Sequence, residues 1–245
     1  MRLRFQFSII PLIATVALVT LGILLGNWQT RRAVEKTALQ MRLDQRSAAP
    51  PLVLGAAPQD AAALEFRRIV VTGQFKADWP VLLDNRPLDG RSGFIVLTPF
   101  TIAGSNRQVL VARGWLARDP AAPGRTPAPD TLAPPPGSVT IEGIAVVRPA
   151  RVMQLGTPPA IKPGAVVQNL EVEDFARASG LDLQPFLLEQ TGPALPGEML
   201  VRKWPVPSVD VDRHKGYALQ WYALAAMAFL FFVMTGCRRG RKQTG

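Results

Sequence analysis

Two long apolar runs without a charged residue lie near the ends of the 245-residue chain, at Phe7–Leu25 and Tyr217–Cys237. As α-helices they would be about 28 and 31 Å long, enough to cross the hydrocarbon core of a bilayer. Trp28 follows the first run, and Trp221 and Tyr222 lie near the start of the second, where aromatic rings favour the membrane–water interface. The pattern predicts two transmembrane helices, whose aromatic rings are either plain anchors or parts of a site.

The first run is read either as a cleaved signal peptide or as a signal anchor. Arg2 and Arg4 form a basic start, but the run exceeds the roughly 7–15 apolar residues of a signal peptide, and no A-x-A-like cleavage site follows. We therefore expect an anchor, with both chain ends on one side. The tail after Cys237 is basic and free of acids, which favours the cytoplasm, and a long middle segment is translocated largely regardless of its charge.

These features predict a linear organisation of a protein in a bacterial inner membrane. Its expected parts are a cytoplasmic N-terminus (1–6), a transmembrane helix (7–27), a connector (28–42), a periplasmic β-rich domain (43–208), a second connector (209–216), a second transmembrane helix (217–237) and a basic cytoplasmic tail (238–245). No Arg- and Ser-rich amphipathic transit segment precedes the first apolar run, which favours a bacterial over a mitochondrial membrane.

The middle segment alternates between short β-type runs and turn signals. Runs rich in β-branched and aromatic residues are Phe66–Phe75, Val81–Asp84, Gly93–Ile102, Gln108–Leu116, Ser138–Arg148 and Gln184–Gln190. The proline-rich segment Asp119–Gly137 is expected to be a loop without fixed helix or strand. Val172–Ser179 is expected to be a helix, with Asn169 as its cap and Gly180 as its stop. The prediction is a mostly antiparallel β domain with minor helix, either a barrel or a sandwich.

The composition excludes several classes of function. The chain has one histidine, His214, and one cysteine, Cys237, so the middle segment can hold neither a Ser-His-Asp triad nor C-x-x-C chemistry. Nucleotide-binding, metalloprotease and hydrolase motifs are missing from the sequence. Much of the net charge of +10 lies in the two terminal segments, and no basic block is interleaved with aromatic residues, so we expect no nucleic-acid binding. Cys237 is expected to be a passive apolar residue or a palmitoylation site.

Four separated blocks resemble one family, the surfeit locus protein 1 family of cytochrome c oxidase assembly. The blocks are Gly26-x-Trp28-Gln29-x-x-Arg32-x-x-x-Lys36, then Glu65-Phe66-Arg67 with Gly73-x-Phe75, then Val109-Leu110-Val111-Ala112-Arg113-Gly114-Trp115, and finally His214-x-Gly216-Tyr217-Ala218-x-Gln220-Trp221-Tyr222. The third block departs from the family pattern at Ala112, where asparagine is usual. The resemblance follows the whole chain in order.

The resemblance implies a non-enzymatic helper of oxidase assembly. It implies haem a as a transient cargo, subunit I of the oxidase as a partner, and haem a synthase as a candidate donor, in contact with membrane lipid. We expect His214, Tyr217 and Trp221 at the cofactor, with His214 as the ligand of the haem iron. Two alternatives stay open: a scaffold that holds subunit I without binding haem, and a haem-modifying membrane enzyme, which the lack of further redox ligands disfavours.

On a helix, His214, Ala218, Trp221 and Ala225 share one face, because they lie at i, i+4, i+7 and i+11. Ala218 leaves a shallow slot between imidazole and indole, in which a flat macrocycle could lie with the imidazole nitrogen on iron. The alternative is a water-exposed interfacial histidine. Second axial ligands in principle are Met153, Met199 and Met227, but nothing in the sequence positions them.

Three further features are candidate partner or structural motifs. Gly22 and Gly26 form a G-x-x-x-G pair, which either lets the two helices pack closely, bringing Trp28 and Gln29 near His214, or is coincidental. Arg32 belongs to the first block of the resemblance. Arg113, in the block that continues with Gly114 and Trp115, is expected to be either a strand-edge cation or the salt-bridge partner of a haem propionate or a protein.

Overall fold

The computed structural model describes residues 3–5, 8–122, 124–147, 149–154, 156–193, 198–204 and 210–239. The chain divides into two compact units, Met1–Leu43 with Pro207–Gly245, and Asp44–Val206. Part of the basic start and tail, including Arg2 and Arg241, lies outside the described residues, as does Arg148 at the end of a predicted strand.

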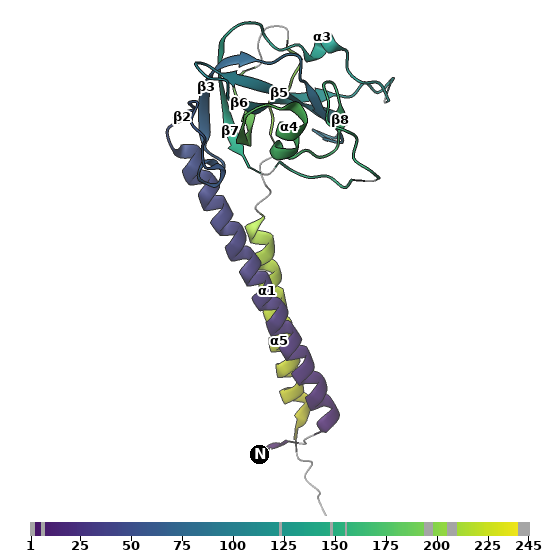
Figure 1. Cartoon of the computed structure of the whole chain (residues 1–245). Coiled ribbons are helices and arrows are strands. Elements are labelled where there is room, and N and C mark those ends of the chain that lie inside the picture. Colours follow the sequence, from purple (N-terminus) through teal and green to yellow (C-terminus); the bar gives the residue numbers. More distant parts are fainter. Residues whose placement is uncertain are drawn as a thin grey trace, which may run out of the picture. The chain divides into compact units, whose positions relative to one another are not determined.

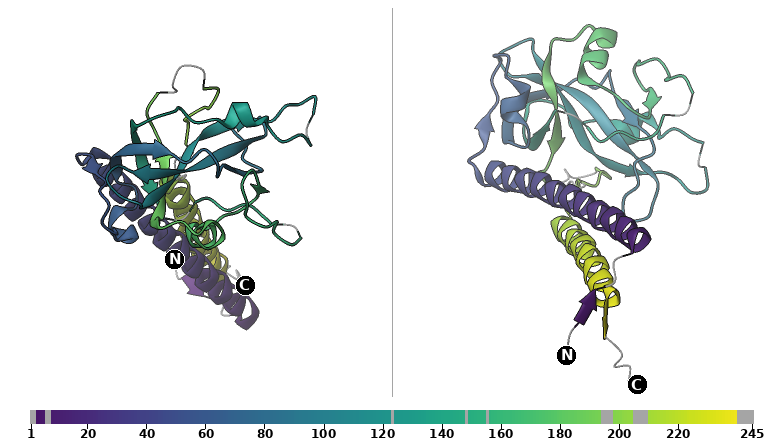
Figure 2. Two further views of the ribbon diagram at one scale, coloured as in Figure 1. Left: turned by 45° about the horizontal axis from the view of Figure 1, so that its top comes forward. Right: turned by 90° about the horizontal axis from the view of Figure 1, so that it is seen from below.

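The first unit is built on two long helices, α1 (Ile9–Ala48) and α5 (Val211–Gly236) (Figure 1). Both are long and apolar enough to cross a membrane, with mean hydropathies of 2.5 and 1.7 over their most apolar windows. Residues 28–42, which the sequence placed in a connector, continue α1 without a break. Two short strands, β1 (Leu3–Phe5) before α1 and β10 (Cys237–Arg239) after α5, pair in antiparallel fashion (Figure 2).

The residues of α1 and α5 that are wholly or partly buried recur at alternating spacings of three and four. In α1 they include Thr15, Val19, Gly22, Gly26, Gln29 and Ala33, and in α5 His214, Ala218, Trp221, Ala225, Ala228 and Phe232. This is the heptad spacing of a coiled coil, and we call these positions the helix seam. The seam is made mostly of small residues, which let two helices approach closely where no hydrophobic effect drives them together.

The second unit is a closed β barrel. Its sheet has the order β2-β3-β7-β9-β6-β5-β4-β8, and an additional pairing of β3 with β5 closes a ring of five strands, β3-β7-β9-β6-β5 (Figure 1). The strands are β2 (Leu52–Val53), β3 (Arg68–Phe75), β4 (Val81–Leu83), β5 (Gly93–Ile102), β6 (Gln108–Ala117), β7 (Val139–Val146), β8 (Val166–Val167) and β9 (Leu183–Gln190). The alternative that the sequence left open is thus decided in favour of the barrel.

Two apolar layers hold the barrel together. One fills its interior with side chains from every strand of the ring, among them Val71, Phe100, Val111 and Phe186. The other lies outside, where Phe175 of helix α4 (Val172–Ser179) packs on the outer face of the sheet. A third cluster joins Phe94 to the short helix α3 (Pro129–Leu132). Alternating side chains along each strand therefore feed two different cores, which explains why β5 and β6 are almost wholly buried.

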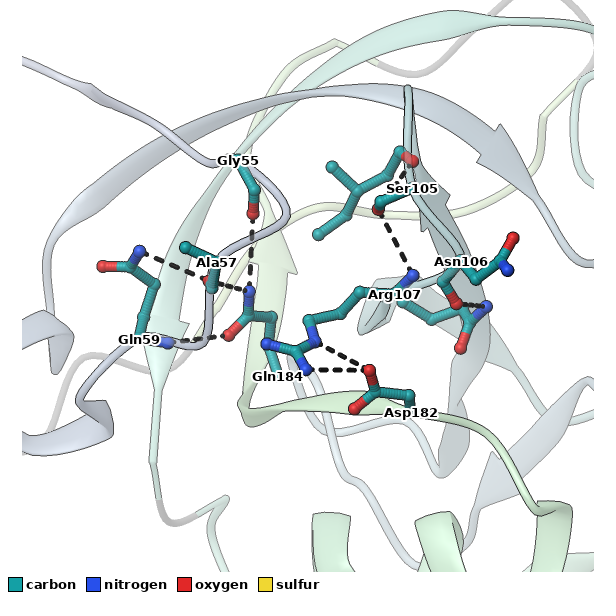
Figure 3. Close-up of polar contacts among 10 residues, drawn as sticks. Gly55, Ala57, Gln59, Ser105, Asn106, Arg107, Asp182 and Gln184 are labelled. Atoms are coloured by element: carbon teal, nitrogen blue, oxygen red, sulfur yellow. Dashed lines mark hydrogen bonds and ion pairs between the residues drawn. The ribbon is translucent and has the colours of Figure 1, made fainter.

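A buried glutamine amide and a partly exposed ion pair form polar contacts around the starts of β6 and β9 (Figure 3). Gln184 is fully buried; its amide Nε2 donates to the Ala57 carbonyl at 2.8 Å, and its Oε1 accepts from the Gln59 backbone N–H at 3.1 Å. Arg107 binds one oxygen of Asp182 through two nitrogens, at 2.9 and 2.8 Å. The contacts of Gln184 fix the segment that leads into helix α2 (Ala61–Leu64), whose first turn is capped by the side chain of Asp60.

Most predicted strands are found within one or two residues of their expected bounds, and β5 and α4 match them. The domain is mostly antiparallel, with parallel pairs at β2–β3, β4–β8 and β6–β9. Two details were wrong. The proline-rich loop contains the four-residue helix α3, because Pro129 begins a turn that Leu132 anchors in the core. Asn169 does not cap α4: the N-cap is Glu171, and Asn169 binds both backbone groups of Val152.

Glu189 makes the stability of the β unit depend on pH. It lies half-buried on the outer face of β9, opposite Ala112 and Ile144, and burial raises its pKa from 4.5 to about 7. The folded state then holds this proton more tightly than the unfolded state, so this contribution to stability is complete below about pH 4.5 and is lost as pH rises to about 7. We expect Glu189→Gln to raise the free energy of unfolding at pH 8 by roughly 1–3 kcal/mol, and to flatten this part of the profile. Thermal unfolding between pH 4.5 and 8 measures it; equal slopes in both proteins would contradict it.

Candidate functional site in the helix pair

The two glycines of the G-x-x-x-G pair face α5. A Cβ atom on Gly22 would lie 2.9 Å from the Cβ of Ala225 and 3.0 Å from the backbone oxygen of Trp221. A Cβ on Gly26 would meet the ring of Tyr222 at 2.5 Å. Gly22 therefore needs glycine, because the helix α5 backbone and the Cβ of Ala225 occupy the space that a side chain would fill; at Gly26 a side chain would displace the ring of Tyr222. The close packing predicted from the sequence is confirmed, and the reading as coincidence is wrong.

Polar side chains cross the helix pair just beyond the glycines. The hydroxyl of Tyr222 donates to Oδ1 of Asn27 at 2.7 Å and lies 3.4 Å from Oγ1 of Thr30. Thr30 in turn donates to the Gly26 carbonyl at 2.9 Å. The hydrogen bond of its hydroxyl to Asn27 thus holds the ring of Tyr222 against Gly26. This contact limits the movement of α5 along the axis of α1.

His214 is held against α1 by a hydrogen bond. Its Nδ1 lies 2.7 Å from Oε1 of Gln29, a residue with a side chain that is only 9 % exposed. Both residues occupy the helix seam, one on each helix. The sequence had placed Gln29 near His214 through the packing of the glycines, and the structure confirms that neighbourhood. These two polar side chains in a mostly apolar seam satisfy each other, which avoids the cost of an unpaired polar group.

The slot that the sequence suggested for a flat macrocycle does not exist in this form. The expected face of His214, Ala218, Trp221 and Ala225 is the seam itself, and both alanines are only 6 % exposed. The small side chains that would leave room for a ligand instead leave room for α1, whose Gly22 packs against Ala225. A ligand of His214 would therefore lie outside the seam.

The remaining predicted residues of this region lie on the outer flanks of the two helices. Tyr217, one turn from His214, is 42 % exposed, and Trp28, beside Gln29, is 45 % exposed. Arg32 is exposed and forms an ion pair with Glu35 at 3.0 Å. Within the described residues, no three His, Cys, Asp or Glu side chains come together as a metal site.

Arg113 has a different position from the one expected. Its side chain is 1 % exposed and faces the interior of the barrel, where its guanidinium lies 5.3 Å from the ring centre of Phe75. It donates to the carbonyls of Leu132 and Ala133, at 2.6 and 3.2 Å, and to Glu198 at 2.6 Å. The expectation of a strand-edge cation is therefore wrong. Arg113 lies on β6, and β6 has a neighbour on both sides in the closed ring of strands. Its Nη atoms are engaged inside the β unit, which leaves little of the group for a propionate.

Glu198 joins Arg113 to a second buried arginine. Arg202, 5 % exposed, forms an ion pair with the other carboxylate oxygen of Glu198 and donates to the Arg113 carbonyl at 3.0 Å. Burial lowers the pKa of both arginines, and the charge of Glu198 opposes that shift. Sequence reasoning missed Glu198 and Arg202, since they lie some 85 residues from Arg113 in a segment without a strand pattern.

Gly114 and Trp115 contact the same segment of the chain that carries Glu198 and Arg202. A Cβ atom on Gly114 would lie 2.9 Å from the Cβ of Leu200, so glycine lets the strap of residues 198–204 cross β6. Trp115 pairs with Val201 through two backbone hydrogen bonds of 2.8 Å, and its indole N–H donates to the Arg86 carbonyl at 2.7 Å. The third block of the resemblance therefore has a structural role in the β unit: it binds the strap.

The chain has two candidate membrane helices with a polar pair in their seam, and a closed β barrel lies between them in the sequence. These features define the class of this protein as a membrane-anchored β-barrel protein. Its described residues form no recognisable catalytic constellation. Its sequence extends that description. The sequence model of the SURF1 family matches residues 16–226, most of the chain. The chain belongs to the SURF1 family.

Curated relatives agree with this assignment. A SURF1-like protein of Monosiga brevicollis is 28 % identical over 243 residues, which cover 94 % of this chain and 88 % of the relative. An uncharacterized SURF1-like protein of Mycobacterium tuberculosis is 26 % identical over 257 residues, covering 98 % and 90 %. The cytochrome oxidase assembly protein SHY1 of Saccharomyces cerevisiae is 28 % identical over 109 residues, covering 44 % of this chain and 28 % of that protein. Members of comparable length thus occur in bacteria as well as eukaryotes.

Proposed function

We propose that this protein is an assembly factor for haem–copper cytochrome c oxidase that binds haem a through His214 and assists its insertion into subunit I. Its family membership and the name of its yeast relative as a cytochrome oxidase assembly protein support the general function. The haem step is supported by the chemistry around His214, the single histidine of the chain. The protein acts in this proposal by binding and release, without turnover.

One observation carries the haem assignment: the imidazole of His214 is held through one nitrogen only. Nδ1 is engaged by Gln29, and within the described residues Nε2 has no hydrogen bond. A histidine that ligates a metal commonly has this arrangement, with the nitrogen that does not bind metal anchored to a carbonyl oxygen. Imidazole is an established axial ligand of haem iron.

The surroundings of His214 suit an amphipathic macrocycle. His214 lies one turn before the apolar part of α5, and the exposed ring of Tyr217 is on its flank. A haem bound through Nε2 would lie on that outer flank, with its apolar edge toward the bilayer and its propionates toward water. An exposed site on one side of a helix pair leaves the other face of the haem accessible to an acceptor such as subunit I, and to a donor such as haem a synthase.

The second candidate function is a scaffold that binds no haem, and the polar pair in the helix seam supports it. The His214–Gln29 pair sits among small apolar residues, and a single polar pair in such a seam can fix the register of two helices. In that case His214 would serve packing alone, and the protein would stabilise subunit I through its exposed surfaces. The two functions differ in what the loss of His214 does.

We expect His214→Ala to lose most of the Soret absorbance of the full-length protein purified with bound haem, while the protein stays inserted and folded. His214→Met should keep part of the haem, since a thioether is also an axial ligand. Lys215→Ala, an exposed neighbour on the same helix, is the matched control. The measurement is the absorbance spectrum at equal protein concentration. An alanine variant with the wild-type haem content and spectrum would leave the scaffold as the function.

The orientation in the membrane is part of the proposal. Residues 43–208 lie in the periplasm of a bacterial inner membrane and both chain ends lie in the cytoplasm, because the chain carries two candidate spans and a basic tail. A reporter that is active only outside the cytoplasm, inserted at Pro127, should be active. Activity there of a reporter that works only in the cytoplasm would reverse the topology.

A further inference from the structure

We propose that Gln29 is the positioning residue of His214: its side-chain carbonyl holds the imidazole in the Nδ1–H tautomer and so presents Nε2, unprotonated and oriented, to a metal. The tautomer of His214 follows from the hydrogen bond alone. The binding of iron by Nε2 rests on the proposed function. Gln29 itself touches neither metal nor cargo in this proposal.

The chemistry of the two groups fixes the direction of the hydrogen bond. An amide oxygen can only accept, so Oε1 of Gln29 at 2.7 Å requires a proton on Nδ1 of His214. A neutral imidazole carries one N–H, so Nε2 is left with its lone pair. The two ring nitrogens point in divergent directions; with Nδ1 directed at α1, Nε2 is therefore directed away from the helix seam.

The packing of α1 explains why Gln29 can hold this position. Its neighbours in the seam are Gly26 and Ala33, whose small side chains bring the second helix within reach of the amide. Gln29 as a residue is only 9 % exposed, so water competes little for its side-chain oxygen. Tyr222, bound to Asn27, fixes the slide of the helices and with it the distance between the two residues. The orienting contact is thus built into the helix pair before any cargo arrives.

Donation of Nδ1–H to a carbonyl does more than orient the ring. It raises the basicity of the opposite nitrogen, and loss of such a partner commonly weakens metal binding by roughly 10–100-fold. We therefore expect Gln29→Leu to weaken the binding of hemin (ferric protoporphyrin IX) by that factor. Gln29→Glu retains an acceptor of the same reach, and should bind hemin at least as well and lower the midpoint potential of the bound iron.

The single histidine makes a direct test possible. The full-length protein, carrying a tag without histidine and labelled with ¹⁵N-histidine, is studied without haem at about pH 9, where an imidazole is neutral. The two ring nitrogens then report the tautomer of His214 alone. We expect the Nδ1–H form in the wild type and in Gln29→Glu, and a shift to the Nε2–H form in Gln29→Leu. Gln45→Leu, the same change at an exposed position of α1, should leave the spectrum unchanged.

Hemin titration of the same four proteins, and of His214→Ala, completes the test. A wild-type spectrum with the proton on Nε2 would overturn the inference, and so would an unchanged tautomer in Gln29→Leu. The expected tautomers together with hemin binding that is indifferent to His214 would disprove the proposed function, and leave Gln29 as an orienting partner in the helix seam only. Weaker hemin binding in Gln29→Leu that Gln29→Glu restores would support both.

Discussion

Glu198→Gln is expected to lower the free energy of unfolding of the β unit by roughly 3–5 kcal/mol. The carboxylate forms ion pairs with two buried arginines, Arg113 and Arg202, which are 1 % and 5 % exposed. A glutamine of the same size keeps the packing but removes the charge that offsets both cations. The two guanidinium groups would then face each other without compensation in a region of low dielectric.

Thermal unfolding of the full-length protein in detergent measures this effect. The β-sheet band of the infrared spectrum separates the β unit from the two helices, and we expect its midpoint to fall by about 10 °C. Asp89→Asn makes the same chemical change in an exposed ion pair with Lys203, and should cost at most about 1 kcal/mol. Equal midpoints for the two variants would show that the buried network contributes no more than a surface pair.

Gly22→Leu is expected to separate the two helices. The nearest atoms to its new Cβ would be the Cβ of Ala225 and the backbone oxygen of Trp221, neither of which can move without a shift of α5. Overpacking of this kind costs about 1–3 kcal/mol, which is a large part of what holds a helix pair together in a membrane. Gly26→Leu should have a smaller effect, because the Tyr222 ring that it meets can rotate away at the cost of its bond to Asn27.

Cysteine cross-linking reports this separation. With Cys237 replaced, cysteines at Ala33 and Val211 place one thiol on each helix, and a short bismaleimide should join them less efficiently in Gly22→Leu than in the parent protein. Ala17→Leu, an equal enlargement at an exposed position of α1, serves as the control. Cross-linking that is as efficient in Gly22→Leu as in Ala17→Leu would mean that the glycine is not needed for pairing.

Local patterns in the sequence correctly predicted those helices and strands that depend on a single kind of pattern, either an apolar run or an alternation bounded by turns. The two charge-free runs predicted the membrane helices, and the alternation and turn signals predicted β5, β9 and α4 almost to the residue. Although the N-cap of α4 was mispredicted, the period of a strand or helix and a glycine stop such as Gly180 are properties of neighbouring residues, so they can be read from the chain. The same holds for the small residues of the helix seam, which predicted that Gln29 and His214 would be neighbours.

The tertiary structure decided what depends on partners distant in the sequence. Closure of the sheet through β3 and β5 made the barrel, and it turned Arg113 from an expected edge cation into a buried one, because a closed ring has no edge at β6. Glu198 became its counter-ion only when the strap crossed Gly114.

The helix pair shows the same division between sequence and structure. The face of His214, Ala218 and Trp221 was correctly predicted as a common face, but only the packing of α1 revealed that this face is occupied. A periodic pattern identifies which residues lie together; what covers them is set by the rest of the fold, since any complementary surface can bury the same face.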